Sequence, residues 1–323
     1  MPGRGAGLTR HAGQPRVIWR FSDGRAGHDN QSLGLVEAIG RCQPVDVHTV
    51  TVPEQAATWR DLVNGRYAAL AALPDPWLLV GAGRRTQRPL LSARRARRGR
   101  AVVIMRPDLP RTLFDLCIIP DHDRPTPAPN VLISRGSLNR MQRVAGRKGA
   151  QGIFLVGGPS RHTRWRDEAV VEQIVRIILE SPPCDWVLAT SRRTPARFAA
   201  EVGRRVIPAG ARLGVLPWQS GGAGCGVAEQ LARSRCAWVT ADSVSMIYEA
   251  LTAGVATGVL DVPARGNGRV VMGLRRLEAA GLVTGFRDWA AGKPLSQPGQ
   301  IFDEANRCAR WICERWGMPS RQA

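Results

Sequence analysis

The sequence has no uninterrupted apolar run long enough to cross a membrane. No segment approaches about eighteen consecutive apolar residues. The opening stretch MPGRGAGLTRHAGQPR contains no apolar core of the kind found in signal peptides. We therefore predict a cytoplasmic protein in which residues 1–15 form a flexible basic tail.

The cysteines show no metal-binding or redox spacing. Seven are present without a CxxC pair, and the nearest two, Cys308 and Cys313, do not have the spacing of zinc ligands. The consecutive residues Asp121, His122 and Asp123 cannot all face one ion from a single loop. We expect reduced thiols, no bound metal and no cofactor.

Lysine is nearly absent, although the formal net charge is +20. Lys148 and Lys293 are the only lysines, so almost all of the basic charge is arginine. This ratio is typical of a GC-rich genome, and the sequence has no dedicated basic arm for nucleic acid. We predict no nucleic-acid partner.

One basic run stands out between Arg84 and Arg100, RRTQRPLLSARRARRGR, which contains eight arginines and no acid. It lacks the interleaved aromatic residues that stack on bases. Two interpretations remain, a solvated helix face or a surface that contacts anionic lipid headgroups from the inner side of a membrane.

The rest of the chain alternates short apolar runs with amphipathic stretches, which indicates an α/β protein with parallel sheets. The predicted strands are Val17–Phe21, Val45–Val52, Trp77–Val80, Ala101–Met105, Leu116–Ile119, Gly152–Val156, Trp186–Ala189, Cys236–Thr240 and Val255–Leu260. The predicted helices are Asp29–Gly40, Thr86–Arg98, Trp165–Leu179, Pro195–Gly203, Ser243–Thr252 and Ile301–Trp316. We predict two Rossmann-like domains, 16–145 and 146–300, joined by a polar linker over 134–151, and a closing helix and tail over 301–323.

Several predicted strands end in small polar residues before the next helix. Ligands of open parallel sheets bind at this edge, where helix amino termini offer unpaired N–H groups. In the loop LVGGPSR, Gly157 and Gly158 allow close approach of a ligand and Ser160 can bond a phosphate. Glycine turns of this kind also occur for packing alone, so the loop is not decisive by itself.

Two further loops follow strands of the second domain. In TSRRTP, Thr194 and Pro195 have the pattern of an N-cap and first helical residue, and Arg192 and Arg193 can clamp a pyrophosphate.

In TADSVSMIYEA, Asp242 or Ser243 is predicted to cap a helix. Glu249 lies two turns further on, where its carboxylate can accept the hydroxyls of a ribose. The alternative is an ordinary capped helix with Glu249 on its solvated face.

The loop SDGRAGHDNQ, Ser22 to Gln31, follows the first strand. Its titratable residues are Asp23, His28 and Asp29. A histidine at a helix amino terminus is held neutral by the helix dipole and can act as a general base. The alternative is a structural, hydrogen-bonded histidine.

Six strings in this order, SDGRAGHDNQSLGL, GAGRR, FDLCIIPDHD, LVGGPSR, TSRRTP and VTADSVSMIYEALTAG, resemble the bacterial relatives of the plant "elongated mitochondria" fission protein. That ELM family, formerly a domain of unknown function, is similar to the GT-B superfamily. The resemblance implies two Rossmann-like domains facing a cleft, with a nucleotide-sugar in the second, an acceptor in the first and a last helix that packs back towards the first.

The resemblance also implies residue roles. Gly157, Gly158 and Ser160 match a diphosphate loop, and Glu249 matches a ribose-binding glutamate, with Asp242 and Ser243 at its helix start. Arg192 and Arg193 would complete the donor side. The acceptor side would consist of Gly24, Arg25, Gly27, Asn30 and Gln31, with His28 as base and Asp23 orienting it.

Three functions remain open at this stage. The first is a metal-independent, GT-B-like glycosyltransferase that uses a nucleotide diphosphate-sugar and an envelope glycan or lipid acceptor. The others are a nucleotide-sugar epimerase and a non-catalytic, membrane-associated scaffold.

Overall fold

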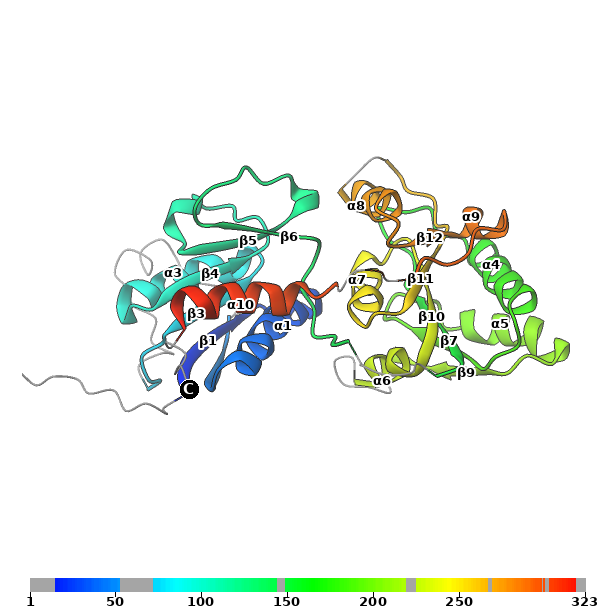
Figure 1. Ribbon diagram of the computed structural model, residues 1–323, viewed down its shortest axis with the longest axis horizontal. Helices are drawn as coiled ribbons and strands as arrows, with labels where there is room; N and C mark the ends of the chain where they lie inside the picture. Colours follow the sequence, from blue (N-terminus) through cyan, green and yellow to red (C-terminus); the bar gives the residue numbers. More distant parts are fainter. Residues whose placement is uncertain are drawn as a thin grey trace, which may run out of the picture. The chain divides into compact units, whose positions relative to one another are not determined.

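The computed structural model describes residues 15–52, 72–143, 149–218, 225–266, 269–297, 299 and 302–317. Within these ranges the chain folds into two units (Figure 1). Unit 1 takes in the chain up to Pro120, Pro125–Ser134 and the segment from Ala305 onward, and unit 2 takes in Asp121–Arg124 and Arg135–Glu304. The predicted basic tail up to residue 14 and the predicted boundary between residues 145 and 146 lie outside the described residues.

Unit 1 is built on a parallel sheet with the strand order β2-β1-β3-β4-β5-β6 in its described part. Its elements are β1 (Arg16–Ser22), α1 (Ala26–Cys42), β2 (Val45–Thr51), β3 (Leu78–Ala82), α3 (Arg84–Arg97), β4 (Arg100–Ile104), the 3₁₀ turn Arg111–Leu113, β5 (Leu116–Pro120) and β6 (Val131–Ser134). After β1 the chain crosses to β2 on one side, and after β3 it crosses to β4 on the other side. Right-handed crossovers therefore place α1 and α3 on opposite faces of the sheet. The direction in which successive strands are added thus reverses between β1 and β3.

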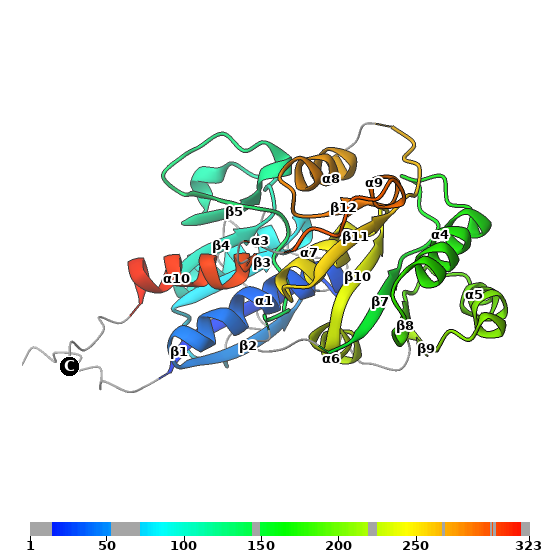
Figure 2. The ribbon, with the colours of Figure 1, turned by 45° about the vertical axis from the view of Figure 1, so that its right-hand side comes forward.

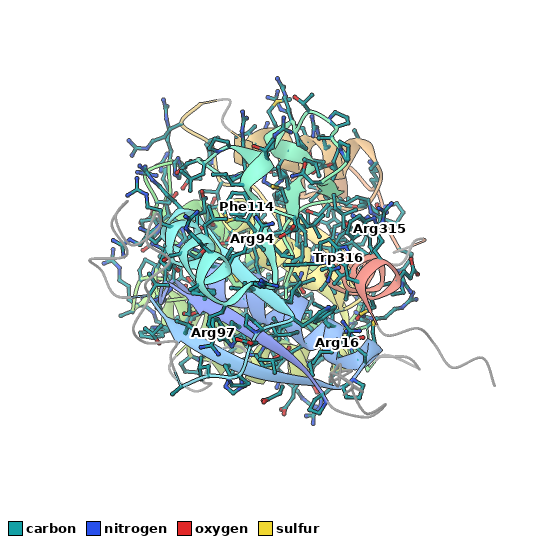
Figure 3. The ribbon with its side chains drawn as sticks, turned by 90° about the vertical axis from the view of Figure 1, so that its left-hand side faces the viewer. Arg16, Arg94, Arg97, Phe114, Arg315 and Trp316 are labelled. Atoms are coloured by element: carbon teal, nitrogen blue, oxygen red, sulfur yellow. The ribbon has the colours of Figure 1, made fainter. Side chains whose placement is uncertain are left out.

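Helix α10 (Glu304–Trp316) closes unit 1, as predicted. Its final carbonyl, that of Trp316, accepts hydrogen bonds from Arg16 Nη1 at 3.0 Å and from Trp77 Nε1 at 3.1 Å. Figure 3 labels Arg16 and Trp316 at this end of the unit. The last helix thus holds the amino-terminal ends of β1 and β3.

Unit 2 repeats the design with the order β12-β11-β10-β7-β8-β9 in its described part (Figure 2). Its elements are the 3₁₀ turn Asp121–Asp123, β7 (Gln151–Val156), α4 (Asp167–Glu180), β8 (Trp186–Thr190), α5 (Phe198–Val206), the 3₁₀ turn Ile207–Ala209, β9 (Leu213–Leu216), α6 (Cys225–Arg233), β10 (Ser234–Thr240), α7 (Val244–Thr252), β11 (Ala256–Leu260), α8 (Arg269–Ala279), β12 (Thr284–Gly285) and α9 (Phe286–Ala290). Here the order reverses between β7 and β10.

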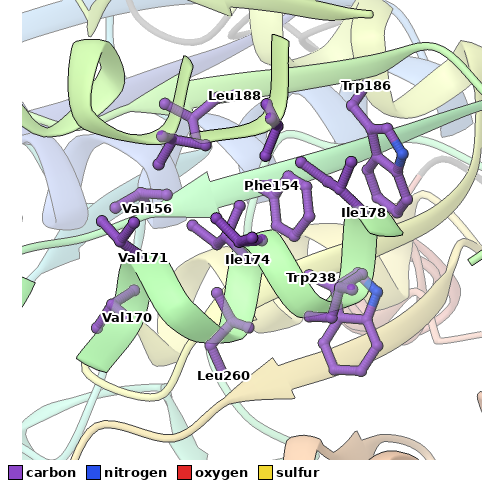
Figure 4. Packing of buried hydrophobic residues seen from close by; sticks show 14 of the residues in the cluster. Phe154, Val156, Val170, Val171, Ile174, Ile178, Trp186, Leu188, Trp238 and Leu260 are labelled. Carbon is purple, nitrogen blue, oxygen red and sulfur yellow. The ribbon is translucent and has the colours of Figure 1, made fainter. Parts of the chain in front are cut away.

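The core of unit 2 packs α4 onto the sheet. Val170, Val171 and Ile174 of α4 are at most 1% exposed and belong to the same cluster as Phe154 and Trp186 (Figure 4). The rings of Phe154 and Trp186 stack with centroids 4.7 Å apart. Fully buried parallel strands explain why the strand segments are continuous apolar runs.

The α/β class and the nine predicted strands are confirmed, but three strands and three helices of the described residues were not predicted. The missed strands β6, β9 and β12 have two to four residues each, too few for a periodic signal. Helices α6, α8 and α9 were also missed. The predicted start of α5 at Pro195 is wrong, because the helix begins at Phe198.

Candidate functional site

The loop after β1 brings Asp23 and His28 together in unit 1. Nδ1 of His28 lies 2.9 Å from Oδ2 of Asp23, whose side chain is only 1% exposed. The buried carboxylate fixes the ring orientation and favours the tautomer with a proton on Nδ1. Nε2 is then the nitrogen that can accept a proton from a substrate.

The turn that places this pair is held by its own side chains. Ser22 Oγ accepts from Gly24 N, and Asp23 Oδ1 accepts from Arg25 N, both at 3.2 Å. Gly24 has φ +72°, a conformation that glycine adopts without strain. Helix α1 therefore begins at Ala26, three residues earlier than predicted, and His28 lies in its first turn.

Gly83 lies directly against the imidazole of His28. It precedes α3 with φ +81°, and a Cβ at this position would overlap Cε1 and Nδ1 of His28. Strands β1 and β3 are neighbours, so the starts of α1 and α3 meet where the strand order reverses. In open α/β sheets this is the place where ligands bind.

The other predicted acceptor-side residues lie on the same turn and helix. Gly24, Arg25 and Gly27 are exposed, whereas Asn30 is half-buried. Gln31 is buried and donates from Nε2 to the carbonyl of Gly27 at 3.3 Å. Its Oε1 has no hydrogen-bond partner within the part of the chain that the structure describes.

In unit 2, Gly157 and Gly158 follow β7 and lie against the loop after β10. The amide of Gly157 donates to Thr240 Oγ1 at 2.8 Å, and that of Gly158 donates to Asp242 Oδ2 at 3.2 Å. These two amides are thus engaged inside the protein. They join the loops that follow β7 and β10, the two neighbouring strands between which the strand order of unit 2 reverses.

Arg193 ties the same two loops together. Its guanidinium lies 2.7 Å from Asp242 Oδ2 and donates to Ser243 Oγ and to the Gly158 carbonyl at 2.8 and 2.9 Å. The Asp242 side chain is fully buried, whereas that of Arg193 is 41% exposed. A buried carboxylate needs such a partner, because an unpaired charge in the interior is costly.

Ser243 occupies the N-cap position of α7 but does not cap it. Its hydroxyl donates to Asp242 Oδ2 at 3.0 Å instead, so no side chain among the described residues caps the first N–H groups of this helix. These N–H groups carry the positive end of the helix dipole.

The prediction that Thr194 is the N-cap of α5 is wrong. Its hydroxyl donates to the Gly157 carbonyl at 2.6 Å and accepts from Ser191 N at 2.8 Å, so it does not cap α5. Ser191 Oγ donates to the same carbonyl at 2.9 Å. The two hydroxyls fix the glycine loop, and this tertiary use of Thr194 explains why α5 starts later.

The remaining predicted donor-side residues lie around this cluster. Ser160 is half-buried and hydrogen-bonds Thr163 Oγ1 at 2.9 Å. Arg192 is exposed beside Arg193, and Glu249 is half-buried in the second turn of α7.

Sequence inspection missed Gly83, Thr240, Ser191 and Thr194 as positioning residues. The strings GAGRR and TSRRTP contain three of them. Their partners lie on other strands, so spacing along the chain carried no signal for the contacts.

The basic run Arg84–Arg100 forms α3 and the start of β4, with its arginines partly engaged in unit 1. Arg84 pairs with Asp108, Arg94 with Asp115 and Arg97 with Asp75, at 2.6 to 3.0 Å. Figure 3 labels Arg94 and Arg97. The run is therefore not a continuous stripe of unpaired charge.

Two features are absent from the described residues. No helix there combines enough length and hydrophobicity to cross a bilayer. No group of three or more His, Cys, Asp or Glu side chains is arranged there to hold a metal ion.

Substituting Gly158 by alanine is expected to lower the free energy of unfolding by about 2 to 3 kcal/mol. The new Cβ would overlap the backbone carbonyl of Arg193, which cannot move without displacing the loop after β8. Urea titration followed by circular dichroism measures the change. Gly266→Ala is the matched control because no atom lies within 4 Å of its Cβ position. Equal stability of the two variants would contradict the packing described here.

The sequence profile described as Mitochondrial fission ELM1 matches residues 26–316. The chain belongs to this family. No curated protein gives a significant sequence match. The matched range includes parts of both units and all residues of the candidate site except Ser22, Asp23, Gly24 and Arg25.

Solved structures show the fold of this family member to be that of GT-B proteins. A provisionally named UDP-N-acetylglucosamine 2-epimerase of Listeria monocytogenes superimposes with a TM-score of 0.56 at 12% identity, over 94% of this chain and 97% of the other. The S. aureus MnaA protein, solved with UDP, gives 0.50 at 12% identity over 96% and 99%. The glycotransferase of kitacinnamycin gives 0.51 at 14% identity over 94% and 100%.

Proposed function

We propose that this member of the ELM1 family is a metal-independent glycosyltransferase that uses a nucleotide diphosphate-sugar. The observation that carries the proposal is the Asp23–His28 pair: a buried carboxylate orients an imidazole at the edge of the sheet where ligands bind. A protein that only bound nucleotide or acted as a scaffold would have no need of an oriented base.

His28 acts as the general base. Nε2 takes the proton of an acceptor hydroxyl while that oxygen attacks the anomeric carbon of the donor sugar. The bond from the anomeric carbon to the diphosphate oxygen breaks, and the nucleoside diphosphate leaves with the electron pair. Asp23 stabilises the imidazolium that forms.

The donor diphosphate binds in unit 2 at the start of α7. The uncapped N–H groups of the first turn favour an anion there, and exposed Arg192 adds positive charge. Arg193 neutralises Asp242, which would otherwise repel the diphosphate. The sequence predicts the diphosphate on the Gly157–Gly158 loop. We place it at α7 instead, because the amides of these two glycines already donate to Thr240 and Asp242 within the protein.

Glu249 binds the ribose. Two turns into α7, a carboxylate is placed to accept from the two ribose hydroxyls when the diphosphate lies at the start of the same helix.

The acceptor side favours an anionic molecule, such as a phosphate-bearing glycan or lipid intermediate. Arg25 is exposed at the start of α1, and Arg84, Arg85 and Arg88 are exposed in the first turns of α3 next to Gly83. Asp108 forms an ion pair with Arg84. The concentration of arginines around the base attracts a negatively charged acceptor.

Two alternatives make different predictions. An epimerase, the activity named for the superimposed Listeria protein, would interconvert nucleotide-sugars without an acceptor. A membrane-associated scaffold would bind anionic vesicles through the basic run without needing His28 or a nucleotide.

Calorimetric titration with UDP, GDP, CMP and dTDP, without added metal, tests the donor site. We expect at least one nucleotide to bind, and Glu249→Ala to weaken that binding by about 10-fold or more because the ribose hydroxyls lose their acceptor. Glu172→Ala is the control, since Glu172 is exposed on α4 of the same unit. If no nucleotide binds the folded protein, the transferase proposal fails.

A further inference from the structure

Two thiols far apart in the sequence meet in unit 1. Cys42 is the last residue of α1 and is exposed, and Cys313 lies in α10 and is half-buried. The Cys42 thiol lies near enough to that of Cys313 to contribute to the raised pKa of Cys313. The two thiols are therefore neighbours in the reduced protein.

The helices that carry these thiols are held side by side by other contacts. Arg41 donates from Nε and Nη2 to Asn306 Oδ1 at 3.1 and 2.8 Å. Arg16 binds the carbonyl of Trp316 at the end of α10. Figures 1 and 2 both show α10 next to α1. The pairing of Cys42 with Cys313 is thus fixed by the fold rather than by chance collision.

We propose that Cys42 and Cys313 are a site of reversible disulfide formation, in which a small disulfide such as oxidised glutathione links α10 covalently to α1. The Cys42 thiolate attacks the small disulfide, releasing one small thiol and forming a mixed disulfide. Cys313 then loses its proton and attacks the Cys42 sulfur, releasing the second small thiol. Two protein thiols are oxidised and one small disulfide is reduced to two thiols.

The surroundings of the thiols determine this order. Burial and the neighbouring Cys42 raise the pKa of Cys313 to about 12, which makes it a poor first nucleophile, whereas Cys42 is exposed to the reagent. Burial likewise raises the pKa of Cys117 and that of Cys236 to about 11. These two thiols therefore do not compete with Cys42 for the oxidant.

The link would act on the architecture of unit 1. Helix α10 is the segment by which the chain returns to unit 1 after unit 2. A bond from Cys313 to Cys42 prevents its release from α1, whose first turn carries His28. The inference does not depend on the proposed glycosyltransferase reaction.

Peptide mapping of the full-length protein tests the proposal. The reduced chain is incubated with oxidised glutathione and digested with trypsin without reductant. Trypsin cleaves after Arg41 and after Arg310, so Cys42 and Cys313 fall on separate peptides and Cys308 is removed from both. We expect these two peptides as one crosslinked species, with a mass about 2 Da below their sum, that dithiothreitol separates.

Two variants distinguish the mechanism from unspecific oxidation. Cys313→Ser is expected to accumulate glutathione on Cys42, because no second thiol resolves the mixed disulfide. Cys42→Ser is expected to leave Cys313 unmodified. Three results with the wild-type protein would overturn the proposal: glutathione that stays on Cys42, dimerisation through Cys42, or two thiols that stay reduced. Circular dichroism of each variant confirms folding.

Discussion

Replacing His28 by asparagine is expected to lower the rate of sugar transfer by about 10²- to 10⁴-fold, the usual contribution of a general base. Asparagine keeps a polar group beside Asp23 and fits against Gly83, where the imidazole lies now. It cannot accept the acceptor proton at neutral pH. Release of the nucleoside diphosphate from the donor identified by calorimetry, with and without a pool of phosphate-bearing acceptors, measures the effect.

The chain contains a matched control for this substitution. His48 on β2 also faces a carboxylate, with Nε2 3.1 Å from Asp46 Oδ2, but it lies on an edge strand away from the helix starts. His48→Asn should leave transfer unchanged. His28→Asn should also bind the donor nucleotide as tightly as the wild type, because the donor residues lie in unit 2. If His28→Asn retains full activity, the imidazole is structural and the base must be sought elsewhere.

Ending the chain after Glu304 is expected to remove most of the stability of unit 1. Helix α10 contributes Ala305, Cys308, Ala309 and Ile312, which are all at most 3% exposed. Losing their burial costs about 5 kcal/mol, a large part of the 5 to 15 kcal/mol that typically stabilises a domain. The carbonyl that binds Arg16 and Trp77 is lost as well.

Hydrogen exchange measured by mass spectrometry locates the loss. Amides of β1 and β3 should exchange much faster in the truncated protein, whereas those of β7 and β10 should keep their protection. A chain ending after Gly317 retains all of α10 and serves as the control. Equal protection of β1 in both truncations would show that α10 does not stabilise the sheet.

The apolar runs allowed the buried strands to be predicted because a parallel strand covered on both faces is apolar along its whole length. Val17–Phe21 and Gly152–Val156 are such segments, and both agree with observed strands. The edge strand β9 was missed because Leu213–Leu216 includes Gly214 and exposed Val215, which leave no apolar pattern. The start of α5 was misplaced because a local capping pattern was overridden by the contacts of Thr194 with β7.

The sequence by itself determined the α/β class, the family and the loops that carry the candidate site, because these depend on patterns local to the chain. The tertiary structure decided which loops meet. Gly83 lies against His28, and Arg193 binds Asp242, because the strand order reverses after β1 and after β7. Cys42 lies beside Cys313 because helix α10 returns to α1. Such contacts join residues far apart in the sequence, and no periodicity or spacing encodes them.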